Sequence, residues 1–90
     1  MKLEWTRSAR VDRLDIHSHI EADNPRAAAN LDQRFQDLAA RLASFPYLGR
    51  PGRVLGTREA VAHSNYMLVY EIEGDVVRIL RVLHVARRWP

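Results

Sequence analysis

Residues 24–53 read NPRAAANLDQRFQDLAARLASFPYLGRPGR, and this stretch carries the signals for one long helix and for its end. Asn24 is a suitable N-cap, and Pro25 suits the first helical position, where its missing N–H costs no hydrogen bond. The apolar residues then follow in the steps of three and four that a buried helical stripe requires. They are Ala28, Leu31, Phe35, Leu38, Leu42 and Phe45. Two glycines and two prolines within residues 46–53 predict a loop after the helix.

The segment before this helix predicts a strand and a second helix. Leu3–Trp5 has the alternation of a short strand, and residues 9–22 have a weak helical period. Thr6 or Ser8 can cap that first helix. Because only a few residues separate the two helices, we expect them to pack as an antiparallel hairpin.

After the loop, the spacing of apolar residues changes to a period of two. This predicts strands at 54–62, 66–72 and 76–84. The last two are joined by Gly74-Asp75, and short turns between neighbouring strands indicate an antiparallel meander. The predicted fold is therefore a single α+β domain over residues 1–90, in the order β-α-α-β-β-β. The helical hairpin covers one face of the sheet and leaves the other face open.

Composition excludes several classes of protein. The chain has 90 residues, 47% of them hydrophobic and 28% charged, which is typical of a globular domain rather than a disordered chain. It has no cysteine, which excludes disulfides, thiolate chemistry and zinc–sulfur sites. No secretory signal or bilayer-length apolar run is visible, so we expect a cytoplasmic protein that does not enter a membrane.

The net charge of +3 arises entirely in the second half of the chain. Residues 1–45 carry seven basic and seven acidic side chains, whereas residues 46–90 carry seven arginines and four acidic side chains. Arginine suits bidentate recognition of phosphate, so a nucleic acid or an acidic protein segment is a reasonable partner. A solvated basic surface explains the same charge equally well.

Histidine and arginine gather near the end of the last strand. His84 ends that strand and Arg87 follows it, while Arg58 and His63 belong to a facing strand. In a regular strand Arg78 and His84 would share a face and Arg81 would point the other way. Such a set suits RNA cleavage by the ribose 2′-hydroxyl, because histidine can move a proton and arginine can hold charge on the phosphate. This scheme needs no metal or other cofactor, and we expect neither.

The candidate catalytic residues are therefore His84, Arg87, Arg81, Arg58 and His63. Candidate nucleic-acid contacts are Arg50, Arg53, Arg78, Arg88, Trp89 and Tyr66, the aromatic rings serving to stack on bases. Each has a structural alternative. Arg81 could simply pair with Glu59 or Glu71, His63 could be a strand-end surface residue, and Trp89 could be a packed terminal anchor.

Five segments in order resemble the RelE/ParE superfamily of toxin–antitoxin toxins. Trp5-Thr6 with Ala9 and Asp12 resembles the opening of that family, and residues 24–28 its interhelix motif. Residues 46–59 and 66–70 resemble the loop with the second strand and the third strand, and residues 79–84 with 86–90 resemble the ending. The resemblance covers nearly the whole chain and implies the same fold of a helical hairpin against an antiparallel sheet.

The resemblance also implies a cognate antitoxin, with which the toxin can form a hetero-oligomer. RelE-like members cut mRNA in the ribosome, whereas ParE-like members poison DNA gyrase without cleaving RNA. RelE-like toxins carry a lysine cluster and a C-terminal tyrosine, but this chain has only Lys2 and has Trp89 near its end. Other ribonucleases of the superfamily use histidine, so a metal-independent mRNA interferase is the first hypothesis. Gyrase inhibition is the alternative, and an inactive family member is a third possibility.

Overall fold

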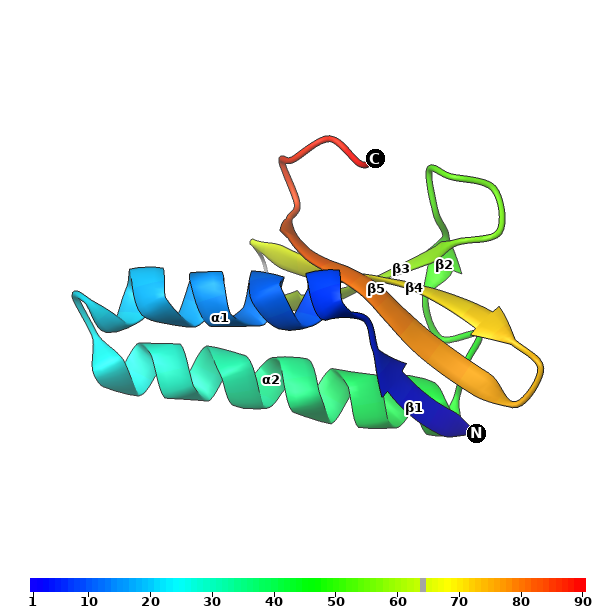
Figure 1. The fold of residues 1–90 in the computed structure, drawn as a ribbon, viewed down its shortest axis with the longest axis horizontal. Coiled ribbons are helices and arrows are strands. Elements are labelled where there is room, and N and C mark those ends of the chain that lie inside the picture. Colours follow the sequence, from blue (N-terminus) through cyan, green and yellow to red (C-terminus); the bar gives the residue numbers. More distant parts are fainter. Residues whose placement is uncertain (64) are drawn as a thin grey trace.

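The computed structural model describes residues 1–63 and 65–90, which form a helical hairpin and a sheet (Figure 1). The elements in chain order are β1 (Lys2–Trp5), α1 (Arg7–Glu21), α2 (Pro25–Ser44), β2 (Arg50–Pro51), β3 (Arg58–His63), β4 (Tyr66–Glu73) and β5 (Val76–His84). The predicted α+β fold is confirmed. The two helices lie side by side and pack on one face of the sheet, as the sequence predicts.

Both helices begin at the caps that the sequence indicates. The hydroxyl of Thr6 accepts a hydrogen bond from the Ala9 backbone N–H at 3.1 Å, and the Asn24 side chain accepts one from Ala27 at 3.0 Å. Each bond satisfies a donor that the first turn of a helix leaves unpaired. Across the hairpin, Arg13 donates two hydrogen bonds to Asp32, at 2.9 and 2.8 Å. The hairpin is therefore fixed at both helix starts and along its length.

The order of strands in the sheet is β1-β5-β4-β3-β2. The predicted antiparallel meander is confirmed for β3, β4 and β5. The first strand departs from it, because β1 pairs parallel with β5. A parallel pair needs a long crossover, and here the whole helical hairpin with the rest of the sheet separates the two strands in sequence. Sequence periodicity carries no information on such a distant pairing.

The loop after α2 also differs from the prediction. It contains the two-residue strand β2, which pairs with the start of β3. The following strand begins at Arg58 rather than at residue 54, because the chain first turns at Gly56, which has a φ of +87°. Positive φ favours glycine and is incompatible with a continuous strand. The apolar residues Val54 and Leu55 therefore lie in a turn and not in the sheet.

The main core lies between α2 and the sheet. Leu31, Phe35 and Leu42 of α2 pack with Leu68 and Tyr70 of β4, and all five are nearly or fully buried. The predicted stripe is correct up to Leu42 but wrong at its end. Phe45 is 63% exposed, because α2 has already ended and the backbone there is no longer helical. No helix of the described part of the chain is apolar enough, over a sufficient length, to cross a membrane.

A β-bulge in β5 changes which side chains share a face. The register moves from Val69–Arg81 to Tyr70–Ile79, so Leu80 is the extra residue. Before the bulge, Arg78 lies on the face of the sheet away from the helices. After it, His84 points to the helix side, where its ring contacts Tyr66. The expectation that Arg78 and His84 share a face is therefore wrong, because a bulge shifts the alternation of a strand by one residue.

Candidate functional site

His84 and Arg87 line a small cleft where α1 passes the end of β5. The cleft has a volume of about 170 Å³, and Tyr66 of β4 forms one of its walls. The rings of Tyr66 and His84 meet edge to face, with centroids 5.5 Å apart. Of the candidate catalytic residues, the structure thus brings together His84 and Arg87, with the stacking candidate Tyr66 beside them.

The hydrogen bonding of His84 limits its chemistry. Its Nδ1 accepts a hydrogen bond from the backbone N–H of Ala86 at 3.1 Å. Nδ1 is therefore the unprotonated nitrogen of the neutral ring, and Nε2 carries the proton. In this tautomer the exposed ring offers a donor at Nε2, while the lone pair that a general base needs is occupied by the backbone.

Two carboxylates also line the cleft, namely Asp12 and Asp15 of α1. They place negative charge beside His84 and Arg87. Like charges that approach within a few ångströms repel strongly where water is partly excluded. A phosphate entering this cleft would therefore meet Asp15 and Asp12 as well as Arg87.

Arg81 is held by Asp12 rather than by Glu59 or Glu71. Its Nε and Nη2 donate to the two carboxylate oxygens at 2.8 and 3.0 Å, which is the bidentate geometry of a strong pair. Hydrogen bonding to Asp12 raises the pKa of Arg81. Asp12 also accepts a hydrogen bond from the backbone N–H of Val82 at 2.9 Å. Val82 lies in the part of β5 that does not pair with β1. The pair therefore attaches α1 to the free edge of β5.

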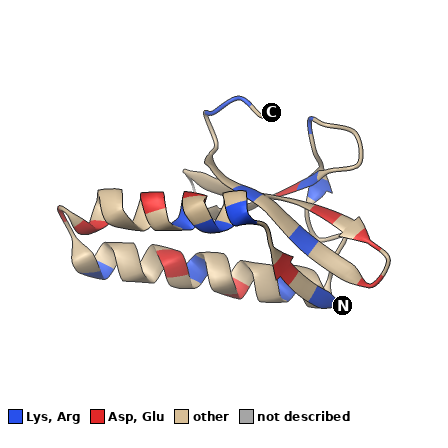
Figure 2. Ribbon diagram, viewed as in Figure 1, with Lys and Arg blue, Asp and Glu red and all other residues tan. Residues whose placement is uncertain are grey.

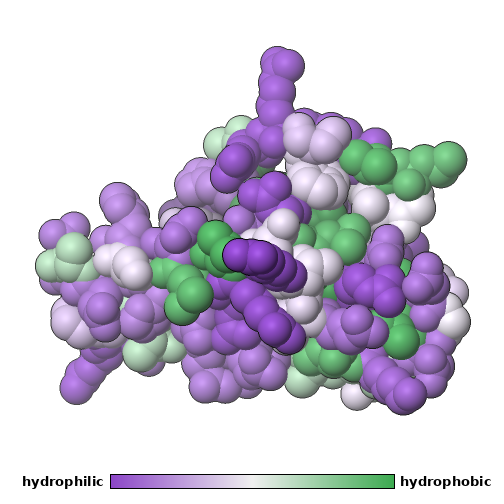
Figure 3. All heavy atoms as spheres, in the orientation of Figure 1, coloured by the Kyte–Doolittle hydropathy of each residue, from purple (hydrophilic) through white to green (hydrophobic). Residues whose placement is uncertain are grey.

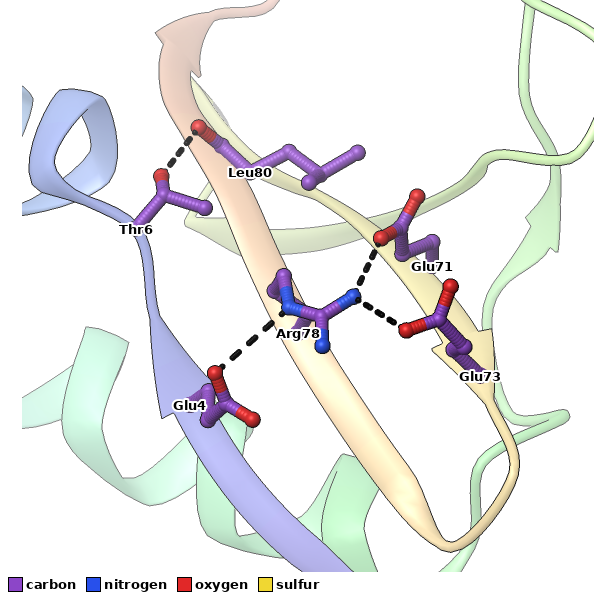
Figure 4. A network of polar contacts seen from close by, with 6 residues as sticks. All are labelled: Glu4, Thr6, Glu71, Glu73, Arg78 and Leu80. Carbon is purple, nitrogen blue, oxygen red and sulfur yellow. Dashed lines mark hydrogen bonds and ion pairs between the residues drawn. The ribbon is translucent and has the colours of Figure 1, made fainter.

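Arg78 sits in an acidic cluster on the outer face of the sheet (Figure 4). Its Nη1 donates to Glu71 at 2.6 Å and to Glu73 at 3.2 Å, and its Nε lies 3.6 Å from Glu4. The hydrogen bond that Arg78 donates to Glu71 is the main reason that the pKa of Arg78 is raised. One positive and three negative side chains leave the cluster with net negative charge, which does not favour contact with a nucleic acid.

Arg58 organises the loop between α2 and β3. It donates to the carbonyl oxygen of Tyr47 at 3.3 Å and to that of Gly49, and its guanidinium lies over the Tyr47 ring at 5.2 Å. Tyr70 also fixes this loop. Its hydroxyl donates to the carbonyl oxygen of Pro46 at 2.6 Å and accepts from the backbone N–H of Gly49 at 3.0 Å. Arg58 is thus engaged with backbone carbonyls.

The other candidates are more widely separated. Glu59 pairs with Arg50 at 3.3 Å and accepts the Arg53 backbone N–H at 3.1 Å, while both arginine side chains remain exposed. Arg88 is exposed in the C-terminal tail, part of which is blue for its basic residues in Figure 2. His63 lines a different hollow from that of His84, on the other side of Tyr66.

Trp89 covers part of the outer face of the sheet. It packs on a small cluster of Met67, Val69 and Leu83, and the guanidinium of Arg81 lies over its ring at 5.8 Å. Its indole N–H is buried and has no hydrogen-bond partner in the described structure. The sheet face that the sequence predicts to be open is therefore partly closed by the tail.

Asp12 is the partner of Arg81 that sequence reasoning did not select. It lies 69 residues before Arg81, so no local sequence pattern connects the two residues. The one indication in the sequence is that Asp12 belongs to the opening segment that resembles the superfamily. Within residues 1–63 and 65–90, no three His, Asp or Glu side chains come together as metal ligands would.

Comparisons with known proteins agree with this architecture. The model of a family described as "ParE toxin of type II toxin-antitoxin system, parDE" matches residues 3–89. "Putative toxin Y4kP" of Sinorhizobium fredii is 43% identical over 91 residues, which cover 99% of this chain and 93% of that protein. "Toxin RelE2" of Caulobacter vibrioides is 32% identical over 83 residues, which cover 92% of this chain and 93% of that protein.

Solved structures show the same fold. A chromosomal ParDE toxin–antitoxin system from P. aeruginosa contains a chain with a TM-score of 0.84 and 27% identity, covering 94% of this chain and 96% of that one. A chain of the RelBE2 toxin–antitoxin complex of Mycobacterium tuberculosis gives a TM-score of 0.67 at 29% identity. The match covers 92% of this chain and 95% of that one. Similarity thus extends to proteins named for both branches of the superfamily.

Proposed function

Because this chain belongs to the ParE toxin family of type II toxin–antitoxin systems, we propose that it is a toxin that acts by binding DNA gyrase and not by cleaving RNA. The observation that carries this proposal is the bidentate Arg81–Asp12 pair. An arginine that stabilises a phosphorane must present its charge to the substrate. Here the charge of Arg81 is matched by a carboxylate of the same chain.

The other arginines of the sheet support the same choice. Arg78 is surrounded by three carboxylates, and Arg58 is bound to the carbonyl groups of the preceding loop. His84, in turn, has its Nδ1 lone pair engaged by the backbone. Three arginines and the Nδ1 of His84 are thus engaged within the fold, and of the cleft residues Arg87 is the exposed cation. A binding protein needs none of these groups free.

The surface offered to a protein target is the outward side of α1. Val11 is 44% and Leu14 is 67% exposed, and green, hydrophobic atoms gather over this helix in Figure 3. Arg7 and Arg10 are exposed on the same helix. An apolar centre with an arginine rim is typical of binding hot spots. Gyrase inhibition also places the toxin in the cytoplasm.

A cognate antitoxin completes the proposal. The similar chains from P. aeruginosa and M. tuberculosis come from structures described as a ParDE toxin–antitoxin system and a RelBE2 toxin–antitoxin complex. A protein that binds only the folded toxin must also stabilise it against unfolding. The melting temperature of the toxin should therefore rise when the antitoxin is added.

The test is a supercoiling assay with purified gyrase and the full chain. The wild type should inhibit supercoiling, and Leu14→Glu should raise the half-inhibitory concentration by about tenfold or more, as loss of a hot-spot residue does. Leu55→Glu is the matched control, because Leu55 is a fully exposed leucine on the β2–β3 loop. Equal loss in both variants, or no inhibition by the wild type, would contradict the proposal.

RNA cleavage is the second candidate, and one observation favours it. His84, Arg87 and Tyr66 line one cleft, which supplies a proton donor, a cation and an aromatic ring. If this is the active site, His84→Ala should abolish growth arrest and remove discrete mRNA ends while the fold is retained. Under the gyrase proposal the same variant should remain toxic.

A further inference from the structure

A second hollow of the surface shares Tyr66 with the His84 cleft. It has a volume of about 480 Å³, within the range of small-molecule sites. The end of α1, the first half of α2, and residues His63 and Asn65 surround it. None of the residues assigned above to RNA cleavage or to gyrase binding, apart from Tyr66 and His63, contributes to it.

The rim of this cavity carries positive charge and hydrogen-bond donors. Arg34 of α2 and His19 of α1 approach it from different helices. The other polar residues of the described lining are Asn30, Asn65 and His63. Arg34 and His19 form no side-chain hydrogen bond or ion pair with a described residue. The lining contains no Asp or Glu, in contrast to the cleft beyond Tyr66.

The floor of the cavity is apolar. Ile20, Leu31 and the ring of Tyr66 line it, and Tyr66 is fixed by edge-to-face contact with Phe35 at 6.0 Å. A ring held in this way loses little freedom when a planar group packs on it. The cavity therefore joins an apolar, aromatic surface to an unpaired arginine.

From this arrangement the geometry points to a binding site for a phosphate monoester on a ring-bearing group, the class of the nucleoside monophosphates. Arginine pairs with two phosphate oxygens at once, and a phosphate has further oxygens for His19 and the two amides. The base or sugar lies on the apolar floor, where aromatic stacking is tolerant of base identity. This site is independent of gyrase binding, and it does not use His84 or Arg87.

The test is a titration of the ¹⁵N-labelled full chain followed by NMR, with adenosine 5′-monophosphate, adenosine and inorganic phosphate as separate probes. Adenosine 5′-monophosphate should give saturable shifts at Arg34, Asn30 and Asn65. Adenosine and inorganic phosphate should each bind at least about tenfold more weakly, because each lacks half of the contacts. Inorganic phosphate binding as tightly as the nucleotide would overturn the proposal, and so would an absence of saturable shifts.

Two variants locate the site. Arg34→Ala should weaken nucleotide binding by about tenfold or more, since it removes a charge-assisted pair. Arg41→Ala is the control, because Arg41 is an exposed arginine of the same helix that lies outside the cavity. The dispersion of the same spectra shows that each variant is folded. Equal weakening in both variants would mean nonspecific attraction to positive charge and would refute the site.

Discussion

The two hollows beside Tyr66 differ in the charge that a ligand would meet. The cleft at His84 contains Arg87 but also Asp12 and Asp15, whereas the cavity at Arg34 contains no carboxylate. Both combine histidine, arginine and the same tyrosine. The difference shows that a cluster of His and Arg in the sequence does not establish the balance of charges that lines a hollow in the fold.

The strongest test of this contrast removes the carboxylate that both neutralises Arg81 and lines the cleft. Asp12→Ala should lower the free energy of unfolding by about 2–3 kcal/mol, because it leaves the Arg81 charge and the Val82 N–H without their partner. The side chain of Asp12 is 12% exposed and that of Arg81 26%, so the loss should be smaller than for a fully buried pair. Urea denaturation measures this value.

A matched control lies in the same cleft. Arg87 is exposed in the C-terminal segment, so Arg87→Ala should change the free energy of unfolding by less than about 0.5 kcal/mol. Arg87→Ala could instead lower the free energy of unfolding as much as Asp12→Ala does. That result would mean that the stabilisation does not come from the Asp12–Arg81 pair between α1 and β5.

A more conservative substitution of Asp12 should alter the charge of the cleft and keep the hydrogen bond from the Val82 backbone N–H. Asp12→Asn keeps an oxygen that can accept the Val82 N–H, so its cost should be about 1–2 kcal/mol. It also removes the carboxylate that balances Arg81. The variant should therefore bind a short single-stranded RNA at low salt more tightly than the wild type, by about three- to tenfold, as gel-shift titration would show. Unchanged affinity would contradict the claim that Asp12 masks Arg81.

The smallest expected effect concerns pH. Because hydrogen bonding to Asp12 raises the pKa of Arg81 above its ordinary value, the stability that protonated Arg81 contributes is fully present below the ordinary arginine pKa. It is lost only as the pH rises through the still higher folded-state value. The difference in unfolding free energy between the wild type and Arg81→Met should thus stay constant from pH 7 to pH 10. A steady decline over this interval would show that a group other than Arg81 controls the pair.

Much of the fold could be predicted from the sequence, because its determinants are local. Asn24 and Thr6 cap their helices as expected, and the periods of α2 and of the last two strands locate those elements to within a residue or two. The parallel pairing of β1, the strand β2 and the bulge at Leu80 could not be predicted. Each depends on contacts between segments that are distant in sequence or on a turn that periodicity does not encode.

The surroundings of the candidate residues could be predicted only in part. His84 and Arg87 do share a cleft, and Trp89 is a packed anchor as its structural alternative proposed. The partner of Arg81 is Asp12 on a helix at the other end of the chain. Likewise, Arg34 and His19 lie on different helices, and only the folded hairpin brings them to one cavity.

We propose that this toxin acts by binding a protein and not by cutting RNA. The most direct measurement is to induce the wild type and His84→Ala in growing cells, and to follow primer extension on abundant transcripts together with the SOS response. If the toxin binds gyrase, SOS induction should come early, transcripts should stay intact, and both proteins should be equally toxic. New discrete ends within translated mRNA, lost in His84→Ala and without early DNA damage, would contradict it and identify the His84 cleft as a ribonuclease site.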